Sequence, residues 1–415
     1  MSDIPRLSVV TFRKGTYILV EGKQAEQRFF IMKDGFVKIT RLVQAAKEKG
    51  KSVIGPGGFI GLVSAVARKN QIETALALTD VVLMVVPLSQ FKVFVRDNPD
   101  LAMKMIQQFS NRMRELNNSL ISISFNTENT GSKTSALFLT GEFYMNSKMY
   151  QEAAYVFKRY TECYPEGEFI TEAAAYLKKL ESHVSFAVRA VKNNFLYTYE
   201  KDSIIFAEGE TGHSLYVIQN GSVKITKIVN GSEIILSILK QGDIFGEMAL
   251  LENKMRSATA IAKENGTVLM EMSKRNFGFL ANRYPEVITR LTAILSKRIW
   301  FSYKQLSNAL IKDPVGRAYN YLAIILEKNN IRRTDDTVYN FDFGPEELMK
   351  MAVIPGDQRT AVTQEILKSG AVSLHNNGRL FSKNVFELFK LGDYHKRIHI
   401  RQAGKEEYTK VKTVS

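Results

Sequence analysis

Glu247 and Arg256 form the pair of side chains in this sequence that is best suited to hold a small charged ligand. Glu247 directly follows Phe245 and Gly246, and Arg256 comes shortly after it. A carboxylate accepts a hydrogen bond from a sugar hydroxyl, and a guanidinium offers a charge-assisted fork of donors to a phosphate. The pair therefore predicts a binding site for a phosphorylated ribose.

The residues around this pair suit the same ligand. Gly246 lets the backbone approach a ligand closely, and a short apolar helix over Glu247 to Leu251 would direct free N–H groups at the phosphate. A cyclic nucleotide carries such a phosphate, one free ribose 2′-hydroxyl and a flat base. The alternative is an Arg–Glu ion pair that ties two turns of an empty barrel. The candidate ligand-binding residues of this stretch are Phe245, Gly246, Glu247, Met248, Ala249, Arg256, Ser257 and Ala258.

An internal repeat indicates which elements must position these side chains. Lys33–Thr40 returns as Gln219–Thr226, and each copy has a Glu-Gly pair before it and a Gly-rich turn after it. In each copy a β-rich run meets an Asx-Gly turn, at Asp34-Gly35 and at Asn220-Gly221. Short strands with glycine turns at this density predict two jelly rolls in tandem.

Each copy of the repeat ends in an amphipathic stretch that predicts a long helix. The two stretches are Ala102–Leu120 and Ile288–Leu310. Such an apolar stripe packs against its own barrel or against a partner helix in a dimer seam. Because two barrels lie in one chain, the two helices can also pair within a monomer.

The first copy of the repeat lacks the ligand-holding pair. Leu62 stands where Glu247 stands, and Gln71 stands where Arg256 stands. Leucine accepts no hydroxyl hydrogen bond, and glutamine carries no charge for a phosphate. The sequence thus predicts a degenerate first domain with a packing or regulatory role.

A helical segment separates the two copies, after a polar linker over 126–135. Its small, aromatic and proline positions resemble one tetratricopeptide repeat, and a further helix over 169–180 can stack on it. We expect a helical spacer packed between the two barrels, because a single repeat cannot bury its face alone. A peptide-binding groove for a protein partner is the alternative. The positions that carry the resemblance are Gly141, Tyr144, Ala153, Phe157 and Pro165.

The Gly242–Leu250 stretch and the following Arg256-Ser257-Ala258-Thr259 resemble the phosphate-binding cassette of the cyclic-nucleotide-binding domain family. From Arg290 onward the chain also resembles the catabolite-activator and fumarate-nitrate-reduction regulators of bacterial transcription. That resemblance implies that Ser302, on the long helix, touches the adenine amino group, which favours cyclic AMP over cyclic GMP. Tyr303 departs from the small hydroxyl residue expected next to it.

The same resemblance implies a winged helix-turn-helix at the C-terminal end. Its first helix would cover 346–352, its recognition helix 357–369, and its wing 372–381 with a turn at Asn377-Gly378. Pro355 breaks the customary turn between the helices. Val362 and Ile366 would face inward. The candidate DNA-contacting residues are Gln358, Arg359, Thr360, Thr363, Gln364 and Lys368.

Bulk composition narrows the classes of function. The chain has 415 residues, a net charge of +15 and one cysteine, Cys163. The charge favours anionic partners. One cysteine forms no internal disulfide and no cysteine cluster for zinc or iron–sulfur centres, and we expect no metal and a cytoplasmic protein. No signal peptide or membrane span is visible. The histidines show no metal or nucleophile motif, so we do not expect an enzyme.

These observations predict an α+β protein of five parts. The parts are a degenerate cyclic-nucleotide-binding-like domain at 1–125, a helical spacer at 133–185, a cyclic-nucleotide-binding domain at 190–312, a winged helix-turn-helix at 313–390 and a basic tail at 391–415. We expect a DNA-binding transcriptional regulator that responds to cyclic AMP or cyclic GMP, as a homodimer or an intrachain pseudo-dimer. The alternative is a cyclic-nucleotide sensor that docks a protein partner and not DNA.

Overall fold

The computed structural model describes residues 7–41, 53–125, 133–182, 190–193, 196–247, 255–273, 285–334, 337–395 and 397. The chain divides into two compact units, which are described separately. Unit 1 contains 1–119, 129–228 and 237–303, and unit 2 contains 120–128, 229–236 and 304–415.

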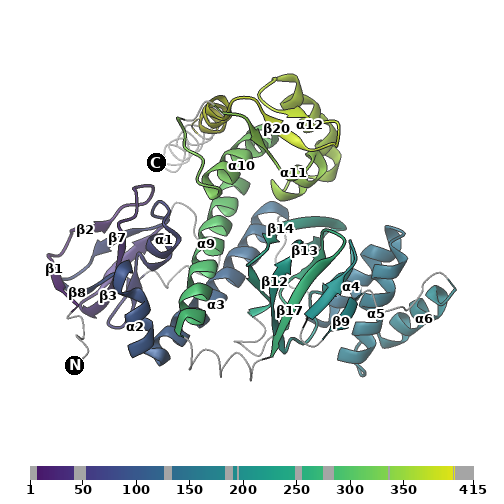
Figure 1. The fold of residues 1–415 in the computed structure, drawn as a ribbon, viewed down its shortest axis with the longest axis horizontal. Coiled ribbons are helices and arrows are strands. Elements are labelled where there is room, and N and C mark those ends of the chain that lie inside the picture. Colours follow the sequence, from purple (N-terminus) through teal and green to yellow (C-terminus); the bar gives the residue numbers. More distant parts are fainter. Residues whose placement is uncertain are drawn as a thin grey trace, which may run out of the picture. The chain divides into compact units, whose positions relative to one another are not determined.

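The first barrel, in unit 1, consists of two four-stranded antiparallel sheets (Figure 1). Its buried core includes Phe30, Val37 and Leu83. Gly35 is required at the turn between the third and fourth strands, because a Cβ there would lie 2.4 Å from the Asp80 carbonyl oxygen. In sheet order the strands are β1 (Val9–Phe12), β8 (Val81–Pro87), β3 (Arg28–Asp34) and β6 (Phe59–Ile60), then β2 (Tyr17–Leu19), β7 (Thr74–Ala77), β4 (Val37–Thr40) and β5 (Val53–Ile54).

The second barrel has the same strand order as the first, with one further strand at an edge. Gly221 takes the place of Gly35 at the corresponding turn, again with a positive φ. One sheet contains β9 (Ala190–Asn193), β10 (Leu196–Tyr199), β17 (Thr267–Ser273), β12 (Ser214–Asn220) and β15 (Ile244–Phe245). The other contains β11 (Ile204–Phe206), β16 (Thr259–Ala262), β13 (Ser222–Val229) and β14 (Ser232–Lys240).

Each barrel is followed by a long helix, as the apolar stripes predict. The first barrel carries α1 (Leu62–Ala67), a 3₁₀ turn (Leu88–Gln90), α2 (Phe91–Asp97) and α3 (Pro99–Phe125), and the second carries α9 (Pro285–Ala309). Within unit 1, the Ser302 hydroxyl of α9 lies 3.2 Å from the Met113 sulfur of α3. The Tyr303 hydroxyl donates to Glu21 of the first barrel at 2.8 Å. The helix of the second barrel thus packs on elements of the first within one chain.

The spacer consists of α4 (Lys133–Asn146), α5 (Tyr150–Cys163) and α6 (Ile170–Leu180). The residues behind the tetratricopeptide resemblance pack together, because a Cβ at Gly141 would lie 2.6 Å from the Phe157 ring. The spacer shares one apolar cluster with the second barrel, which contributes Ile204, Ala207 and Ile261. The spacer is therefore packed onto the second barrel through a common core.

Unit 2 holds the C-terminal helices and a small sheet. Its helices are α10 (Pro314–Lys328), α11 (Pro345–Met351), a 3₁₀ turn (Gly356–Gln358) and α12 (Arg359–Lys368). The sheet has the order β18 (Tyr339–Asn340), β20 (Leu380–Ser382), β19 (Ser373–Leu374). Asp313 caps α10 by accepting backbone N–H bonds from Val315 and Gly316.

The turn between α11 and α12 has no glycine where the backbone turns left-handed. Val353 adopts φ 56°, a conformation that a β-branched residue rarely takes. Arg317 donates to the Val353 carbonyl at 3.1 Å, and Arg359 donates to the Ile354 carbonyl at 3.0 Å. Arg317 and Arg359 therefore stabilise this turn, which the sequence marks as unusual by Pro355.

Candidate functional site

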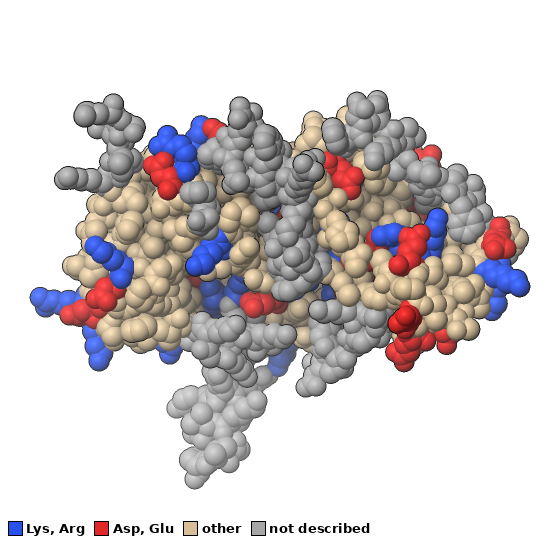
Figure 2. All heavy atoms as spheres, turned by 90° about the horizontal axis from the view of Figure 1, so that it is seen from below, with Lys and Arg blue, Asp and Glu red and all other residues tan. Residues whose placement is uncertain are grey.

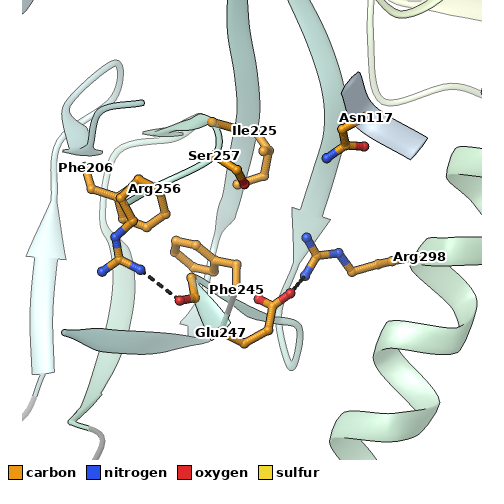
Figure 3. A pocket seen from close by; sticks show the side chains of 10 residues that line it. Asn117, Phe206, Ile225, Phe245, Glu247, Arg256, Ser257 and Arg298 are labelled. Carbon is orange, nitrogen blue, oxygen red and sulfur yellow. Dashed lines mark hydrogen bonds and ion pairs between the residues drawn. The ribbon is translucent and has the colours of Figure 1, made fainter. Parts of the chain in front are cut away.

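Glu247 and Arg256 line one cavity of the second barrel in unit 1 (Figure 3). The cavity measures about 390 Å³ when its opening to solvent is included. The space enclosed by its walls is too small for a nucleotide, so a nucleotide requires lining side chains to move. The residues that line it are Asn117, Phe206, Ile225, Phe245, Gly246, Glu247, Arg256, Ser257, Ala258 and Arg298.

Arg256 is a buried cation at the base of this cavity. Its guanidinium lies 4.1 Å from the Phe206 ring centroid and donates to the Gly246 carbonyl at 2.8 Å. Among the described residues no carboxylate forms an ion pair with it, and its Nε has no hydrogen-bond partner. Burial lowers the pKa of Arg256, because desolvation disfavours the charged form. An anion bound here would relieve that cost.

Gly246 makes the approach of Arg256 possible. It adopts φ 78°, and a Cβ at this position would lie 2.7 Å from Arg256 Nη1. The backbone of Arg256 is fixed from the other side, because its N–H donates to the Glu210 carbonyl at 2.8 Å. Gly246 therefore lets the Arg256 guanidinium lie close to the backbone, in addition to leaving room for a ligand.

Glu247 is fully buried, and it pairs with a residue that the sequence analysis does not assign to the site. Its Oε1 accepts from Arg298 of α9 at 3.0 Å, and Arg298 also donates to the Ile244 carbonyl at 3.2 Å. Its Oε2 has no partner among the described residues. Buried polar atoms are nearly always satisfied in native proteins. Glu247 Oε2 and Arg256 Nε are therefore two groups that a polar ligand can satisfy.

The alternative of an Arg256–Glu247 ion pair is not what the structure shows. Arg256 donates to a backbone carbonyl, and Glu247 pairs with Arg298 instead (Figure 3). The two predicted side chains thus line the same cavity without neutralising each other.

Only some of the other predicted ligand residues line the cavity in the structure. Phe245, Ser257 and Ala258 line the cavity. Met248 and Ala249 lie outside the described residues, as does most of the short helix expected after Glu247. Ser302 is buried against Met113 and does not line the cavity.

Sequence reasoning missed four lining residues: Asn117, Phe206, Ile225 and Arg298. Arg298 lies, after Lys297, in the stretch that resembles the regulator family, so that resemblance could have pointed to Arg298. Phe206 ends the apolar run before Glu208-Gly209. Asn117 belongs to the helix of the first barrel, and nothing in the sequence near the binding motif points to it.

The predicted DNA-contacting residues lie on α12 and the turn before it. Val362 and Ile366 are buried, as the helical spacing predicts. The side chains at 358, 360, 364 and 368 are exposed, and those at 359 and 363 are half-buried. The Arg359 guanidinium is engaged inside the domain, where it pairs with Glu346 at 3.1 Å.

Both barrels match one protein-family model, described as the cyclic nucleotide-binding domain, over residues 9–98 and 196–284. The matched stretches are the two barrels, and together they cover less than half of the chain. In the first barrel, Leu62 and Gln71 stand at the positions of Glu247 and Arg256.

Curated relatives of this chain include bacterial transcription regulators. The cAMP-activated global transcriptional regulator CRP of Escherichia coli O6:H1 is 30% identical over 123 residues, which cover 29% of this chain and 59% of that protein. The cyclic AMP receptor protein of Thermus thermophilus is 35% identical over 102 residues, or 24% of this chain and 47% of that protein. The matches therefore span about half the length of these relatives.

Among solved structures, the CooA mutant of Carboxydothermus hydrogenoformans is similar at 19% identity with a TM-score of 0.39, over 48% of this chain and 87% of that one.

Within the described residues, no helix is long and apolar enough to cross a membrane. The same residues contain no group of histidine, cysteine and acidic side chains that could hold a metal ion.

Proposed function

We propose that this protein is a transcriptional regulator that binds DNA in response to a cyclic nucleotide, with cyclic AMP as the effector. The observation that carries the proposal is the pair of buried, incompletely satisfied groups, Glu247 Oε2 and Arg256 Nε, on one cavity of a cyclic nucleotide-binding domain. The relatives named as a cAMP-activated global transcriptional regulator and as a cyclic AMP receptor protein support the choice of effector and output.

The proposed ligand pose follows from the charges of the cavity. The phosphate binds the Arg256 guanidinium, with the Ser257 hydroxyl and the backbone at Gly246 beside it. The ribose 2′-hydroxyl donates to Glu247. The phosphate and the ribose hydroxyl then provide hydrogen-bond partners for Arg256 Nε and Glu247 Oε2, which have none among the described residues of the protein. The contact of Ser302 with adenine stays a prediction.

Calorimetric titration of the full chain with cyclic AMP and cyclic GMP tests this proposal. We expect saturable binding of one cyclic AMP per chain, and weaker binding of cyclic GMP. If neither nucleotide binds the folded protein, the proposed effector is wrong.

We propose further that the first domain holds no nucleotide, because its own Glu73 occupies the anion position. Glu73 stands where Ala258 stands in the second domain. Its Oε1 accepts from the Gly61 N–H at 3.1 Å, and its Oε2 accepts from Arg41 at 2.7 Å. The backbone N–H that corresponds to that of Gly246 is therefore already bound to a carboxylate, which would also repel a phosphate.

Glu73→Ala should lower the free energy of unfolding by about 1–3 kcal/mol, because it removes the carboxylate that accepts hydrogen bonds from Arg41 and from the Gly61 N–H. Urea unfolding followed by circular dichroism measures the loss. Glu26→Ala is the control, since Glu26 forms an exposed pair with Arg28 and such pairs contribute little. If Glu73→Ala and Glu26→Ala have the same free energy of unfolding, the contacts of Glu73 with Arg41 and Gly61 do not stabilise the first domain.

The geometry of unit 2 supports DNA binding. Helix α12 presents polar side chains outward, follows α11 through a short turn, and precedes the β19–β20 hairpin, an arrangement that fits a winged helix-turn-helix. On the face in Figure 2, the described acidic and basic side chains are interspersed.

Lys368→Ala should weaken DNA binding several-fold and lower the salt dependence by about one counter-ion, because an exposed lysine contributes through phosphate contacts. Gel-shift titration on genomic fragments at several salt concentrations gives both quantities. Lys14→Ala removes the same charge from an exposed position of the first barrel and should have no effect. If the wild type binds no DNA at low salt, the protein-partner alternative takes its place.

We propose that a contact inside unit 2 carries the ligand signal to α11. Lys350 of α11 donates to Glu233 at 3.0 Å, and Glu233 lies on β14, which continues into the second barrel. Under the proposal, nucleotide binding shifts the population of barrel and long-helix arrangements, and α12 is reoriented with them.

A further inference from the structure

The loop over 207–211, between β11 and β12, holds the backbone of Arg256 on both sides. The Arg256 N–H donates to the Glu210 carbonyl at 2.8 Å, and the Gly209 N–H donates to the Arg256 carbonyl at 2.9 Å. The guanidinium of Arg256 lines the cavity of the second domain. Because the backbone of Arg256 is paired with this loop, a shift of the loop moves the guanidinium as well.

The spacer anchors this loop through two side chains at the end of α5. Arg159 donates from Nε to Glu210 Oε2 at 3.0 Å. The hydroxyl of Tyr164, directly after α5, donates to the Gly209 carbonyl at 2.6 Å. The two loop residues that pair with the backbone of Arg256 are therefore the same two that the spacer holds.

Glu210 needs the charge of Arg159 because its carboxylate is buried. Only 3% of Glu210 is exposed, and its Oε1 accepts from the Ala207 N–H at 2.7 Å. Burial raises the pKa of Glu210, and the charge of Arg159 lowers it in part. A buried carboxylate that loses its cation is costly. Without Arg159 the loop is therefore expected to rearrange.

The first domain has the same loop without the acceptor for this anchor. The Gly22 N–H donates to the Gln71 carbonyl, and the Gln71 N–H donates to the Lys23 carbonyl, both at 2.8 Å. This backbone pairing thus occurs in both barrels. Lys23, however, stands where Glu210 stands, and a lysine cannot accept from an arginine. The anchored loop belongs to the barrel that has Arg256, and the barrel that has Gln71 carries a lysine instead.

We infer that Arg159 and Tyr164 are positioning residues for the nucleotide site, because they hold Arg256 where it binds the phosphate. The inference rests on the proposed function, which gives Arg256 that role. Neither Arg159 nor Tyr164 lines the cavity, so both act through the loop over 207–211. The spacer thereby sets the affinity of the second domain for its nucleotide, in addition to connecting the two barrels.

The test is calorimetric titration of the full chain with cyclic AMP, on single variants and on a double variant. We expect Arg159→Ala to weaken binding about tenfold, and Arg159→Lys, which keeps a cation, to restore most of the affinity. Added to Arg256→Ala, Arg159→Ala should cause little further loss, because the side chain that Arg159 positions is absent. A merely structural role would produce the same loss in both backgrounds.

A second variant and a control accompany these measurements. Tyr164→Phe removes only the hydroxyl that donates to the Gly209 carbonyl, and it should weaken binding several-fold. Lys158→Ala removes a charge from an exposed position of the same helix and should bind like the wild type. Urea unfolding followed by circular dichroism shows that each variant is folded during the titration.

The outcomes separate this inference from the proposed function. If the wild type binds no nucleotide, the proposed function fails and the inference fails with it. If the wild type binds cyclic AMP and both Arg159→Ala and Tyr164→Phe bind it equally well, the positioning role alone is overturned. It is also overturned if Arg159→Ala costs the same factor in the Arg256→Ala variant as in the wild-type chain.

Discussion

Arg256→Ala should weaken cyclic AMP binding about 100-fold or more, which is the largest effect we expect on ligand affinity. The guanidinium is the one cation on the described cavity wall without an acidic partner, since Arg298 pairs with Glu247. A buried charge-assisted hydrogen bond to phosphate contributes about 3 kcal/mol, and 1.4 kcal/mol corresponds to a tenfold change in affinity. Titration calorimetry of the variant beside the wild type measures the loss.

Two further variants show whether the effect is specific to Arg256. Arg256→Lys keeps the charge but loses the fork of donors and the stacking on Phe206, so its affinity should lie between those of alanine and the wild type. Lys201→Ala removes a charge from an exposed turn of the same barrel and should change nothing. If Arg256→Ala lost affinity no more than Lys201→Ala, the phosphate would have to bind elsewhere.

Phe157→Ala should lower the free energy of unfolding by about 3–5 kcal/mol, the largest stability effect we expect. The ring is fully buried and stacks on Tyr176 with centroids 4.7 Å apart. It also packs against Gly141 in the cluster that joins the spacer to the second barrel. Removing it leaves a cavity that the aromatic neighbours fill only in part.

Urea unfolding followed by circular dichroism measures this loss, and Leu139→Ala is its control. Leu139 lies on α4 in the same spacer but is 54% exposed, so its truncation should cost less than about 0.5 kcal/mol. Because the core is shared, Phe157→Ala should also destabilise the second barrel. Equal unfolding midpoints for the two variants would mean that the spacer contributes no common core.

The connection between spacer and binding site is close. Arg159 of α5 pairs with Glu210 at 3.0 Å, and the Glu210 carbonyl holds the backbone N–H of Arg256. Tyr164 donates to the Gly209 carbonyl at 2.6 Å, and the Gly209 N–H donates in turn to the Arg256 carbonyl. Loss of the spacer's packing is therefore expected to disturb the position of Arg256.

The sequence alone determined the features that are local along the chain. The repeat of strand, Asx-Gly turn and strand reports local backbone preference, and the structure has two barrels with the same strand order. Glycine at 246 and the residue types at 247 and 256 could be identified because they lie in one short segment whose chemistry suits one ligand. The inward positions 362 and 366 followed from helical spacing.

Only the tertiary structure decided which distant groups complete the site. Arg298 reaches Glu247 from α9, and Asn117 reaches the same cavity from a helix of the first domain. It also decided that Ser302 contacts Met113, and that Glu73 turns back onto Gly61. Such pairings depend on how helices and barrels pack, and packing is set by the shape of whole apolar surfaces, which no short stretch of sequence encodes.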